Sequence, residues 1–400
     1  MRVLHINQYL LRKGGVETYL FGLLPLLAER GVDQRIVYAE GDASAFPDSH
    51  RIPEIGMASF SAHDAVRRKL RIVLEQERPD VIHVHNIHNV AALETCLAYG
   101  PTVLHTHDHR WICPASSFFH RRTQEVCGRV CGPGCLAVTV RKHCLTPRPK
   151  YAAYYLYRGQ WAKGNTSHFA RVVAPCADAK HRLMQAGFED GRIEVLPYFC
   201  PIEPLATPRP IPERTQITYI GRIAPNKGHE FFVRALGELP PDVHGVMVGS
   251  FTAEAEREVM QLAAKAGCAD RLELRKWASR EEVLQILDAT SVFIFPSLWP
   301  ETLGIVGIEA LSRGVPVVGS DLGGVREWLY HRENGMLVSP KSASQIRDAV
   351  LELTASKDTL LAFGAQALST IRQKFMPAQH VDALLGMYEA ATRTVLHPAA

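Results

Sequence analysis

The stretch Phe295-Pro-Ser-Leu-Trp-Pro-Glu-Thr-Leu-Gly-Ile-Val-Gly-Ile-Glu-Ala310 links a short apolar run to a helical pattern and indicates the fold of the second half of the chain. The apolar run, residues 291–295, is typical of a strand that a parallel sheet buries. Pro300 is expected to close the strand and to open the helix. The helix would then carry two acids, Glu301 and Glu309, eight positions apart.

The predicted start of this helix is a site for an anionic ligand. Backbone N–H groups of Leu303, Gly304 and Ile305 would have no intrahelical partners, and the helix dipole adds to their attraction for a phosphate or sugar oxygen. Glu301 would lie at the mouth of the site, and Glu309 about two turns further along. Two acids are unexpected beside a phosphate alone. We therefore expect a ligand that also has vicinal hydroxyls, because carboxylates accept pairs of hydrogen bonds.

The composition predicts a globular chain of two domains. Its 400 residues, of which 46% are hydrophobic, exceed what one ordinary core accommodates. No apolar run approaches the roughly 20 residues of a membrane-spanning helix. Residues 1–10 have the pattern of a strand rather than of a signal peptide, so a cytoplasmic location is expected.

Strand patterns alternate with helical patterns almost throughout, which predicts parallel sheets with helices on both faces. Five prolines between Pro201 and Pro212 interrupt the alternation and mark an interdomain connector. Ser279 and Glu282 have the spacing of a capping box for a helix over residues 280–287. The expected strands are residues 2–8, 34–39, 81–85, 102–106, 171–174 and 193–197 before the connector, and 217–220, 243–248, 271–275, 291–295, 316–319 and 336–338 after it.

A glycine turn follows the first strand of each half. In the first half, Lys13-Gly14-Gly15 would let the backbone approach an oxyanion, and an ordinary tight turn is the competing interpretation. The three spaced glycines of a dinucleotide site are missing, which disfavours a nicotinamide dehydrogenase. In the second half, Arg222 and Lys227 flank the turn. Either one alone is commonly a solvated surface residue, but the pair suits a diphosphate leaving group.

These segments resemble family 4 of the retaining glycosyltransferases. The resemblance rests on Gly14-Gly15-Val16-Glu17, on the loop from Gly221-Arg222 to Lys227-Gly228, and on Glu301 and Glu309 with seven residues between them. It implies the α/β fold GT-B, in which two doubly wound Rossmann-like domains face a cleft. The implied parts are an acceptor domain over residues 1–199, a connector over 200–214, a nucleotide-sugar-binding domain over 215–375, and a helix over 376–400 that packs back on the first domain.

The resemblance also implies how a nucleotide-sugar donor is held. Glu309 would bind the ribose hydroxyls, Glu301 and the amides after it the sugar and phosphates, and Arg222 with Lys227 the diphosphate. Gly15 would contribute an amide. On the front-face route that the family implies, the departing phosphate oxygen takes the acceptor proton, so no dedicated protein base is required. Glu301 would then be a positioning residue. No metal is needed for catalysis if the two cations neutralise the diphosphate, and no Asp-x-Asp segment is present.

A histidine is the remaining catalytic candidate. Leu104-His105-Thr106-His107-Asp108 ends the fourth expected strand, where the family places a histidine beside the reacting sugar. His107 is preferred because it lies just past the strand, and His105 is the alternative. A lone histidine is more often structural, so the choice rests on the resemblance. Histidine would offer a hydrogen bond to a sugar hydroxyl and a dipole beside the forming cation.

A cysteine-rich insertion, at about residues 109–149, departs from the family pattern. Its five cysteines are Cys113, Cys127, Cys131, Cys135 and Cys144. Nothing in the sequence directs export, so metal binding is favoured over disulfides. We expect a structural zinc held by four of the five thiolates, or with His143 or His120 in place of one, and an iron–sulfur cluster is the alternative. The insertion would shape acceptor recognition rather than take part in the chemistry.

The charge is unevenly distributed. Residues 1–199 contain 25 Lys and Arg against 18 Asp and Glu, whereas the remainder contains 20 against 23. The basic segments 67–71 and 141–161, the latter rich in tyrosine, suit a membrane surface at the inner face. A solvated helix face with ordinary core aromatics is an equally good interpretation. Nucleic acid is disfavoured because no binding motif accompanies the charge.

The sequence thus predicts a retaining glycosyltransferase that moves a hexose-type sugar from a nucleoside diphosphate to a hydroxyl of a glycan, lipid-linked or small-molecule acceptor. A GT-B nucleotide-sugar epimerase is the rival enzyme. A nucleotide-sugar-binding regulatory protein without catalysis is the rival from another class. The base, the sugar and the acceptor are left open, because base contacts in this architecture are largely backbone and packing.

Overall fold

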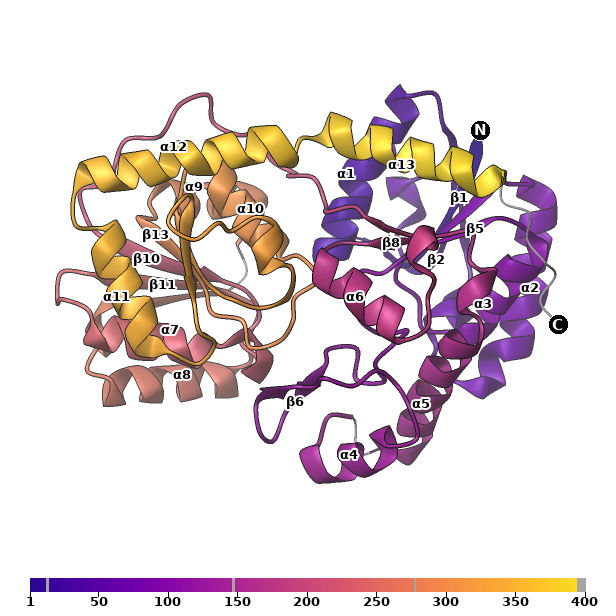
Figure 1. Ribbon diagram of the computed structural model, residues 1–400, viewed down its shortest axis with the longest axis horizontal. Helices are drawn as coiled ribbons and strands as arrows, with labels where there is room; N and C mark the ends of the chain where they lie inside the picture. The colour runs from indigo at the N-terminus through magenta and orange to yellow at the C-terminus, as the bar shows by residue number, and fades with distance from the viewer. Residues whose placement is uncertain (12–13, 146–147, 277, 394–400) are drawn as a thin grey trace. The chain divides into compact units, whose positions relative to one another are not determined.

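Figure 1 shows the computed structural model of the chain, which describes residues 1–11, 14–145, 148–276 and 278–393. The chain divides into two compact units. Unit 1 comprises Met1–Arg122, Cys127–Pro201 and the segment from Pro377 onward, and unit 2 comprises Thr123–Val126 and Ile202–Met376. Residues 201–215 contain no helix or strand, in keeping with their proline density. Lys13 of the first glycine turn lies outside the described residues.

Unit 1 is built on a seven-stranded parallel sheet in the order β3-β2-β1-β4-β5-β8-β9. The order reverses between β1 and β4, which makes the sheet doubly wound. The strands are β1 (Arg2–Leu10), β2 (Asp33–Gly41), β3 (Ser49–Arg51), β4 (Val81–Val84), β5 (Thr102–His105), β8 (Arg171–Ala174) and β9 (Ile193–Val195).

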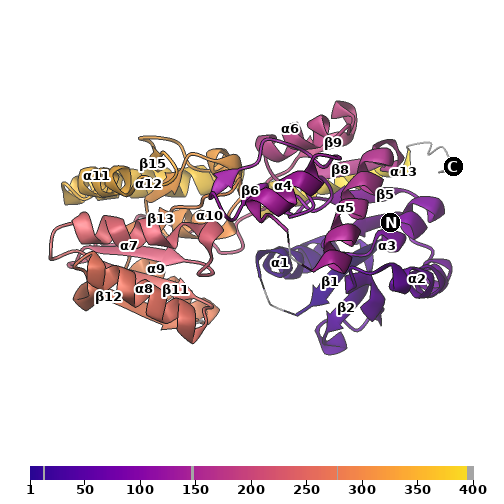
Figure 2. The same cartoon turned by 90° about the horizontal axis from the view of Figure 1, so that it is seen from below.

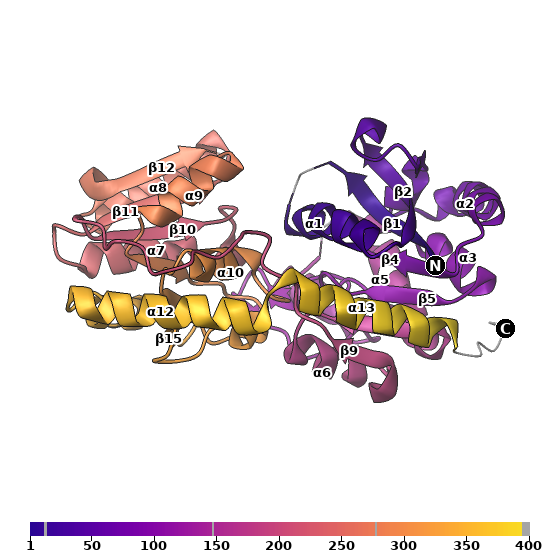
Figure 3. The ribbon, with the colours of Figure 1, turned by 90° about the horizontal axis from the view of Figure 1, so that it is seen from above.

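Helices cover both faces of this sheet. α1 (Gly15–Glu29) and α13 (Pro377–Thr392) lie on the face seen in Figure 3. The opposite face is covered by α2 (His63–Glu77), α3 (Val90–Tyr99), α5 (Pro149–Gly164) and α6 (Ala177–Gln185) (Figure 2). The cysteine-rich segment contributes β6 (Phe119–His120), β7 (Glu125–Val126) and α4 (Cys135–Lys142). Short 3-10 turns occupy residues 43–45, 53–56, 60–62, 166–168 and 190–192.

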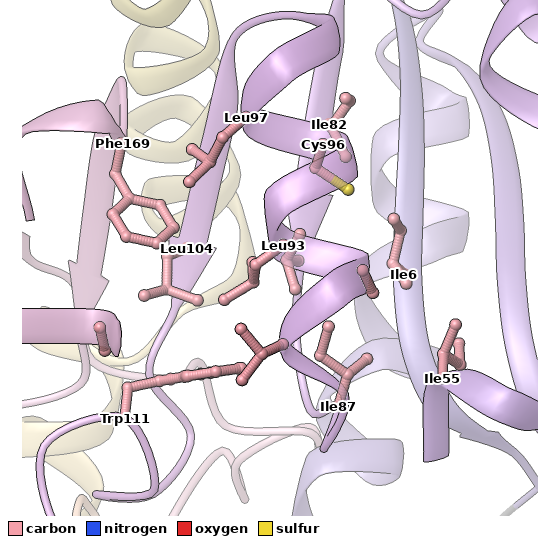
Figure 4. Close-up of a cluster of buried hydrophobic side chains, with 14 of the residues drawn as sticks. Ile6, Ile55, Ile82, Ile87, Leu93, Cys96, Leu97, Leu104, Trp111 and Phe169 are labelled. Carbon is pink, nitrogen blue, oxygen red and sulfur yellow. The ribbon is translucent and has the colours of Figure 1, made fainter. Parts of the chain in front are cut away.

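Strand alternation decides what each face of the sheet buries. Leu4 and Ile6 of β1 point to one face with Ile82 of β4 and Leu104 of β5, and α3 packs on them (Figure 4). These side chains are fully buried, so the hydrophobic effect fixes the register of the strands against α3. The residues between them point to the other face, where α1 and α13 lie, and several of those residues are histidines.

Unit 2 contains a six-stranded parallel sheet in the order β12-β11-β10-β13-β14-β15. Its order reverses between β10 and β13. The strands are β10 (Gln216–Ile220), β11 (His244–Gly249), β12 (Leu272–Lys276), β13 (Val292–Phe295), β14 (Val317–Ser320) and β15 (Gly335–Val338).

The helices of unit 2 form a layer on each side of this sheet (Figure 1). One layer contains α7 (His229–Glu238), α8 (Ala253–Lys265) and α11 (Ala343–Leu353), and the other contains α9 (Arg280–Asp288), α10 (Ile305–Ser312) and α12 (Lys357–Lys374). The 3-10 turns of the unit are Pro225–Lys227, Ala269–Arg271 and Gly323–Glu327. Both units are therefore α/β sandwiches of the doubly wound kind, and the predicted fold class is confirmed.

The sequence pattern located the regular elements well. Each of the twelve predicted strands is present, with ends that differ by at most two residues. β3, β6 and β7 were not predicted, because strands of two or three residues leave almost no alternation to detect. The predicted capping box is present, since the Ser279 hydroxyl accepts from the Glu282 amide and the Glu282 carboxylate accepts from the Ser279 amide.

The predicted start of the helix after β13 is wrong. α10 begins at Ile305, so Pro300 and Glu301 belong to a loop, and of the two acids only Glu309 lies on the helix. The reason is Gly304, which has a φ of +89° and so cannot continue a right-handed helix. A side chain at this position would also overlap the ring of Phe295. Glu301 therefore owes its position to loop packing rather than to helical periodicity.

Gly228 provides a test of how tightly the loops after β10 and β13 are joined. Its φ is +66°, and a Cβ built on it would lie 1.8 Å from the carbonyl oxygen of Pro296. Gly267 has a similar φ of +70° with nothing within 4 Å of its Cβ position. Gly267→Ala should lower the free energy of unfolding by about 1–2 kcal/mol through backbone strain alone. Gly228→Ala should lower it by about 2–5 kcal/mol, because overpacking adds to the strain. If denaturant titrations gave equal losses of unfolding free energy for both variants, the loops after β10 and β13 would be shown to separate freely.

Candidate functional site

The candidate donor site lies at the carboxyl ends of β10 and β13 in unit 2. These neighbouring strands flank the point where the strand order reverses, which is where doubly wound sheets bind ligands. Two contacts to one carbonyl oxygen join the loops that leave them. The Leu298 amide donates to the Asn226 carbonyl oxygen over 2.9 Å, and the Ser297 hydroxyl, which donates to Glu301, lies 3.3 Å from the same oxygen. Lys227 and Glu301, 74 residues apart, are thereby brought together.

Glu301 is buried and holds three hydrogen-bond donors on one oxygen. Lys227 Nζ lies 2.5 Å, Trp299 Nε1 2.7 Å and Ser297 Oγ 2.9 Å from its Oε1. Lys227 Nζ also lies 5.4 Å from the centroid of the Trp299 ring, a cation–π contact. Among the described residues, Oε2 of Glu301 has no hydrogen-bond donor, so it is the oxygen left for a ligand hydroxyl. The carboxylate is fixed in orientation before any ligand arrives.

Arg222 belongs to the same end of the sheet. It follows β10 directly, its side chain is exposed, and its carbonyl oxygen accepts a hydrogen bond of 2.8 Å from the Tyr219 hydroxyl. Burial raises the pKa of Tyr219 well above its usual range, the charge of Glu301 adds to the rise, and the charge of Arg222 opposes it. Both charges thus act on one tyrosine. The structure therefore places Arg222 at the end of β10, in the loop that also carries Lys227, and its predicted role at the site stays a prediction.

The amides predicted to bind an anion follow Glu301. Among the described residues, no acceptor is hydrogen bonded to the backbone N–H of Leu303, Gly304 or Ile305. The Leu303 carbonyl oxygen is fixed by the Trp328 indole, which donates to it over 2.7 Å. Donors without protein partners at the start of a helix suit an oxyanion.

Glu309 has a partner that the sequence reading missed. It lies one turn into α10, is buried, and its Oε1 accepts from Nη1 of Arg280 over 2.8 Å. Burial raises the pKa of Glu309, and the charge of Arg280 opposes the rise. The capping box at Ser279 could have drawn attention to Arg280, because it makes this arginine the first residue of a helix that follows a strand.

A second glycine pair was also missed. Gly323 and Gly324 follow β14, and the Gly324 amide donates to the Glu301 carbonyl oxygen over 2.7 Å. A Cβ on Gly324 would lie 2.3 Å from the carbonyl oxygen of Thr302. The backbone that carries Glu301 therefore rests directly on the loop after β14. The sequence contains the same signal here as at Gly14 and Gly15, which is a pair of glycines a few residues after a strand.

In unit 1, the glycine turn opens α1. Gly14 is the N-cap residue, Gly15 begins the helix, and both are exposed. The Gly14 N-cap has no side chain that could accept a hydrogen bond from the first turn, and Oε2 of Glu17 would lie 3.4 Å from a Cβ built on Gly14. The predicted role of this turn toward an oxyanion stays a prediction.

His107 lies in a buried layer of histidines in unit 1. The layer comprises His5 of β1, His83 and His85 at β4, and His105 and His107 at β5, and strand alternation points all five to the face under α1 and α13. From α13, the Tyr388 hydroxyl lies 2.6 Å from Nδ1 of His83, and Nε2 of His380 lies 2.8 Å from the Tyr19 hydroxyl of α1.

Hydrogen bonds run through this histidine layer. Nδ1 of His5 lies 3.1 Å from Nε2 of His85, and Nδ1 of His85 lies 3.0 Å from Nε2 of His107. Nδ1 of His107 lies 2.7 Å from the Tyr198 hydroxyl. Both ring nitrogens of His107 thus have protein partners, and a sugar hydroxyl would have to replace one of them. Burial lowers the pKa of His107 to about 3, so the ring is neutral and offers a dipole rather than a charge.

His105, the alternative candidate, is fully buried. Among the described residues, neither of its ring nitrogens has a hydrogen-bond partner. Two triplets of the layer, His5-His83-His85 and His85-His105-His107, have ring nitrogens within 4.8 Å of one another. His85 belongs to both triplets and both of its ring nitrogens are already hydrogen bonded, so a metal at either triplet would have to replace one of those bonds.

The five cysteines of the insertion divide into two groups. Cys113, Cys127, Cys135 and Cys144 line one cavity together with His120. Cys131 is buried against α5 and is not among the lining residues. His143 caps the end of α4 and is exposed. Four of the five cysteines are thus grouped around the cavity, and Cys131 is separate from them.

The aromatic residues considered for a membrane surface differ in burial: Tyr154 is buried, Tyr151 is exposed, and Tyr155, Tyr157 and Trp161 are half-buried. The Tyr154 side chain is fully buried, and its hydroxyl accepts from the Val90 amide over 2.9 Å. The rings of Trp161 and Trp111 lie 6.4 Å apart. Tyr154 is therefore a core residue, as the competing interpretation stated. In the part of the chain that the structure describes, no helix is long and apolar enough to cross a membrane.

The histidine layer should make unit 1 sensitive to acid. Burial lowers the pKa of His5 to about 3 and of His380 to about 4, and it lowers the pKa of His83, His85 and His105 well below the ordinary range. Unfolded histidines bind protons below about pH 6.5, whereas these bind them only in much stronger acid. Stability is therefore full above pH 6.5 and falls as the pH drops towards 3, by about 1.4 kcal/mol per histidine and pH unit.

Denaturant titrations between pH 8 and pH 5 would measure this dependence. His105→Gln should make the slope shallower by about one proton, because glutamine does not titrate. His181→Gln, a change at an exposed histidine of α6, is the matched control and should leave the slope close to that of the parent. A flat profile in the parent protein would contradict the prediction, since it would mean that the layer accepts protons while folded.

Comparison with known proteins identifies the family. The model described as Glycosyltransferase Family 4 matches residues 13–203, and that described as Glycosyl transferases group 1 matches residues 207–369. A GDP-mannose-dependent alpha-(1-6)-phosphatidylinositol monomannoside mannosyltransferase from Mycobacterium tuberculosis is 31% identical over 162 residues, which cover 38% of this chain and 42% of that protein. D-inositol 3-phosphate glycosyltransferase from Nocardia farcinica is 28% identical over 242 residues, which cover 55% and 52%. The chain thus spans about half the length of the curated relatives it matches.

The fold has a solved counterpart. HepE from Anabaena in complex with UDP-glucose matches with a TM-score of 0.71 at 16% identity, over 98% of this chain and 100% of that one. At this identity the match concerns the fold alone, which is GT-B. Two family models that together span both units, over a fold of this type, lead to one conclusion: the chain belongs to family 4 of the glycosyltransferases.

Proposed function

We propose that this chain is a retaining glycosyltransferase that moves a hexose-type sugar from a nucleoside diphosphate to an acceptor hydroxyl. The observation that carries the proposal is the buried Glu301 carboxylate, held by Lys227 beside three backbone amides that have no protein acceptor among the described residues. One wall thus offers a cation, amide donors and an oriented acceptor. A diphosphate attached to a polyol requires all three.

The names of the compared proteins support a nucleotide-sugar donor. The Mycobacterium tuberculosis relative is called GDP-mannose-dependent, and the HepE structure contains UDP-glucose. The two differ in base and in sugar, so neither identity is transferred to this chain. The shared chemistry, a hexose on a nucleoside diphosphate, is the part that we propose here.

The proposed roles of the residues in unit 2 follow from their contacts. Glu309, oriented by Arg280, holds the ribose hydroxyls. Oε2 of Glu301 accepts from a hydroxyl of the sugar, and its Oε1 keeps Lys227 in place. The Lys227 ammonium has three N–H donors, so it binds Glu301 and a phosphate oxygen at the same time. The roles that the family resemblance gives to Gly14, Gly15 and His107 stay predictions.

The proposed reaction is a front-face displacement. The bond between the anomeric carbon and the phosphate oxygen breaks, and the acceptor oxygen bonds to the same face of that carbon. The acceptor proton passes to the departing phosphate oxygen, so the products are the glycosylated acceptor and the nucleoside diphosphate. Arg222 and Lys227 stabilise the charge that grows on the diphosphate. Glu301 aligns the sugar through a hydrogen bond and forms no covalent bond to it. This role fits a carboxylate that three donors hold in place.

Two substitutions should separate binding from turnover. Glu309→Ala removes the proposed ribose ligand and should raise the dissociation constant of the donor about tenfold to a hundredfold. Lys227→Ala removes charge stabilisation from the leaving group and should lower kcat about a hundredfold with a smaller effect on donor binding. Glu258→Ala and Lys265→Ala, both at exposed positions of α8, are the matched controls. Calorimetry and steady-state kinetics give the two quantities. Parental values for both test variants would mean that the donor site lies elsewhere.

A panel of UDP-, GDP- and ADP-sugars should identify the donor and test the reaction class. We expect one base to raise the thermal midpoint of unfolding more than the others, since ligands stabilise the state that binds them. With that donor, release of nucleoside diphosphate should depend on an added acceptor, and the new linkage should keep the anomeric configuration. Conversion of the donor without any acceptor would favour an epimerase. A donor that binds and is never consumed with glycan, lipid-linked or small-molecule acceptors would favour a regulatory protein.

Contact with a membrane surface is the remaining proposal about partners. Leu136 and Val140 are 62% and 72% exposed on α4, where Arg141 and Lys142 follow them. Exposed apolar residues beside basic ones support peripheral contact with an anionic surface, which would suit a lipid-linked acceptor.

A further inference from the structure

The cysteine-rich insertion of unit 1 forms a partly open cavity of about 150 Å³. The thiols that line it come from four different segments of the chain. Cys113 follows the turn after β5, Cys127 follows β7, Cys135 begins α4 and Cys144 lies just after α4. Four cysteines around one cavity supply the number and kind of ligands that a tetrahedral structural zinc site requires.

Cys131 is separated from these four. Its Sγ lies against α5, where a Cβ added to Gly159 would be only 2.6 Å away, and it lies 3.8 Å from the carbonyl oxygen of Leu156. Its thiol donates to that carbonyl oxygen, so Cys131 is engaged with α5 and not with the cavity.

Cys113 is the buried member of the four, whereas Cys127, Cys135 and Cys144 are half-buried. Four thiolates in one place that is largely removed from water would be costly, and a bound Zn²⁺ would compensate their charge.

The walls of the cavity have to move inward to bind an ion. Among the described residues, only the two histidine triplets are sets of three or more ligand atoms within 4.8 Å of one another. Tetrahedral zinc–thiolate bonds of about 2.3 Å place the sulfurs about 3.8 Å apart. Residues 127–134, which connect two of the four thiols, contain no helix or strand, so this segment can close without breaking a regular element.

We propose that Cys113, Cys127, Cys135 and Cys144 bind one structural zinc ion, and that Cys131, which is held against α5, does not bind the metal. Each sulfur that is a thiol in the free protein gives its proton to solvent as its bond to zinc forms, and no oxidant or reductant takes part. The bound ion would tie Cys127 and α4 to the turn after β5. His107 and the ion pair of Asp108 and Arg110 lie at the start of this turn. The role is structural, and it is independent of the proposed transfer reaction.

Metal analysis of the full chain, purified without added metal, tests the proposal. We expect about one zinc per chain, and X-ray absorption at the zinc edge should give four sulfur neighbours at about 2.3 Å. Cys113→Ser, Cys127→Ser, Cys135→Ser and Cys144→Ser should each lower the zinc content at least about fivefold. Cys131→Ser should keep about one zinc, as should Cys268→Ser, a change at a buried cysteine of unit 2. The comparison of Cys131→Ser with Cys135→Ser is the sharpest, because the two positions are close in the chain but only Cys135 lines the cavity.

Several outcomes would overturn the proposal. Detection of iron together with acid-labile sulfide would show an iron–sulfur cluster in place of the proposed zinc. A metal-free chain whose thiols all react with a disulfide reagent would exclude a metal site. A nitrogen neighbour in the absorption spectrum would make His120 a ligand in place of one cysteine. Loss of zinc in Cys131→Ser would refute the choice of four. Because the metal content and the absorption spectrum are measured on the parent protein, the test holds even where a serine variant fails to fold.

Discussion

The close approach of three backbone loops in unit 2 is the constraint on which the candidate site depends. The loop after β13 lies against the loop after β10 at Gly228 and against the loop after β14 at Gly324, with no room for a side chain at either contact. Hydrogen bonds from Leu298 to Asn226 and from Gly324 to Glu301 fix both contacts. Glu301 is thus held by main-chain packing on two sides, which gives a loop residue the positional accuracy of a regular element.

Charge completes what the packing begins. A buried carboxylate is costly unless it is paired and hydrogen bonded, and Glu301 meets both conditions through Lys227, Ser297 and Trp299. Glu309 meets them through Arg280. Both acids are therefore oriented before a ligand binds, which reduces the entropy that binding has to overcome. The first pair also keeps the Lys227 cation next to the proposed diphosphate position, so the arrangement serves the leaving group as well as the sugar.

Unit 1 uses a different device to hold its C-terminal helix. A layer of neutral histidines lies where most parallel sheets have aliphatic side chains, and Tyr388 and His380 of α13 hydrogen-bond into it or to the adjacent helix. Polar contacts of this kind are directional, so they help to specify that α13, rather than another helix, covers this face of the sheet. The two H-x-H patterns were visible in the sequence, but only strand alternation in the folded sheet shows that they form one layer with His5.

The sequence by itself determined the parallel α/β class, the proline connector, the capping box at Ser279 and the types of residue at the site. These features depend on local periodicity and on the chemistry of residues that are close in the chain. Tertiary structure alone decided that Glu301 lies in a loop, that Arg280 pairs with Glu309, and that four of the five cysteines of the insertion share a cavity from which Cys131 is excluded. Each of these depends on contacts between residues distant in the chain, and no local pattern encodes them. The physical reason is that a loop takes its conformation from the surfaces it packs against, whereas a strand or helix takes its own largely from its periodicity.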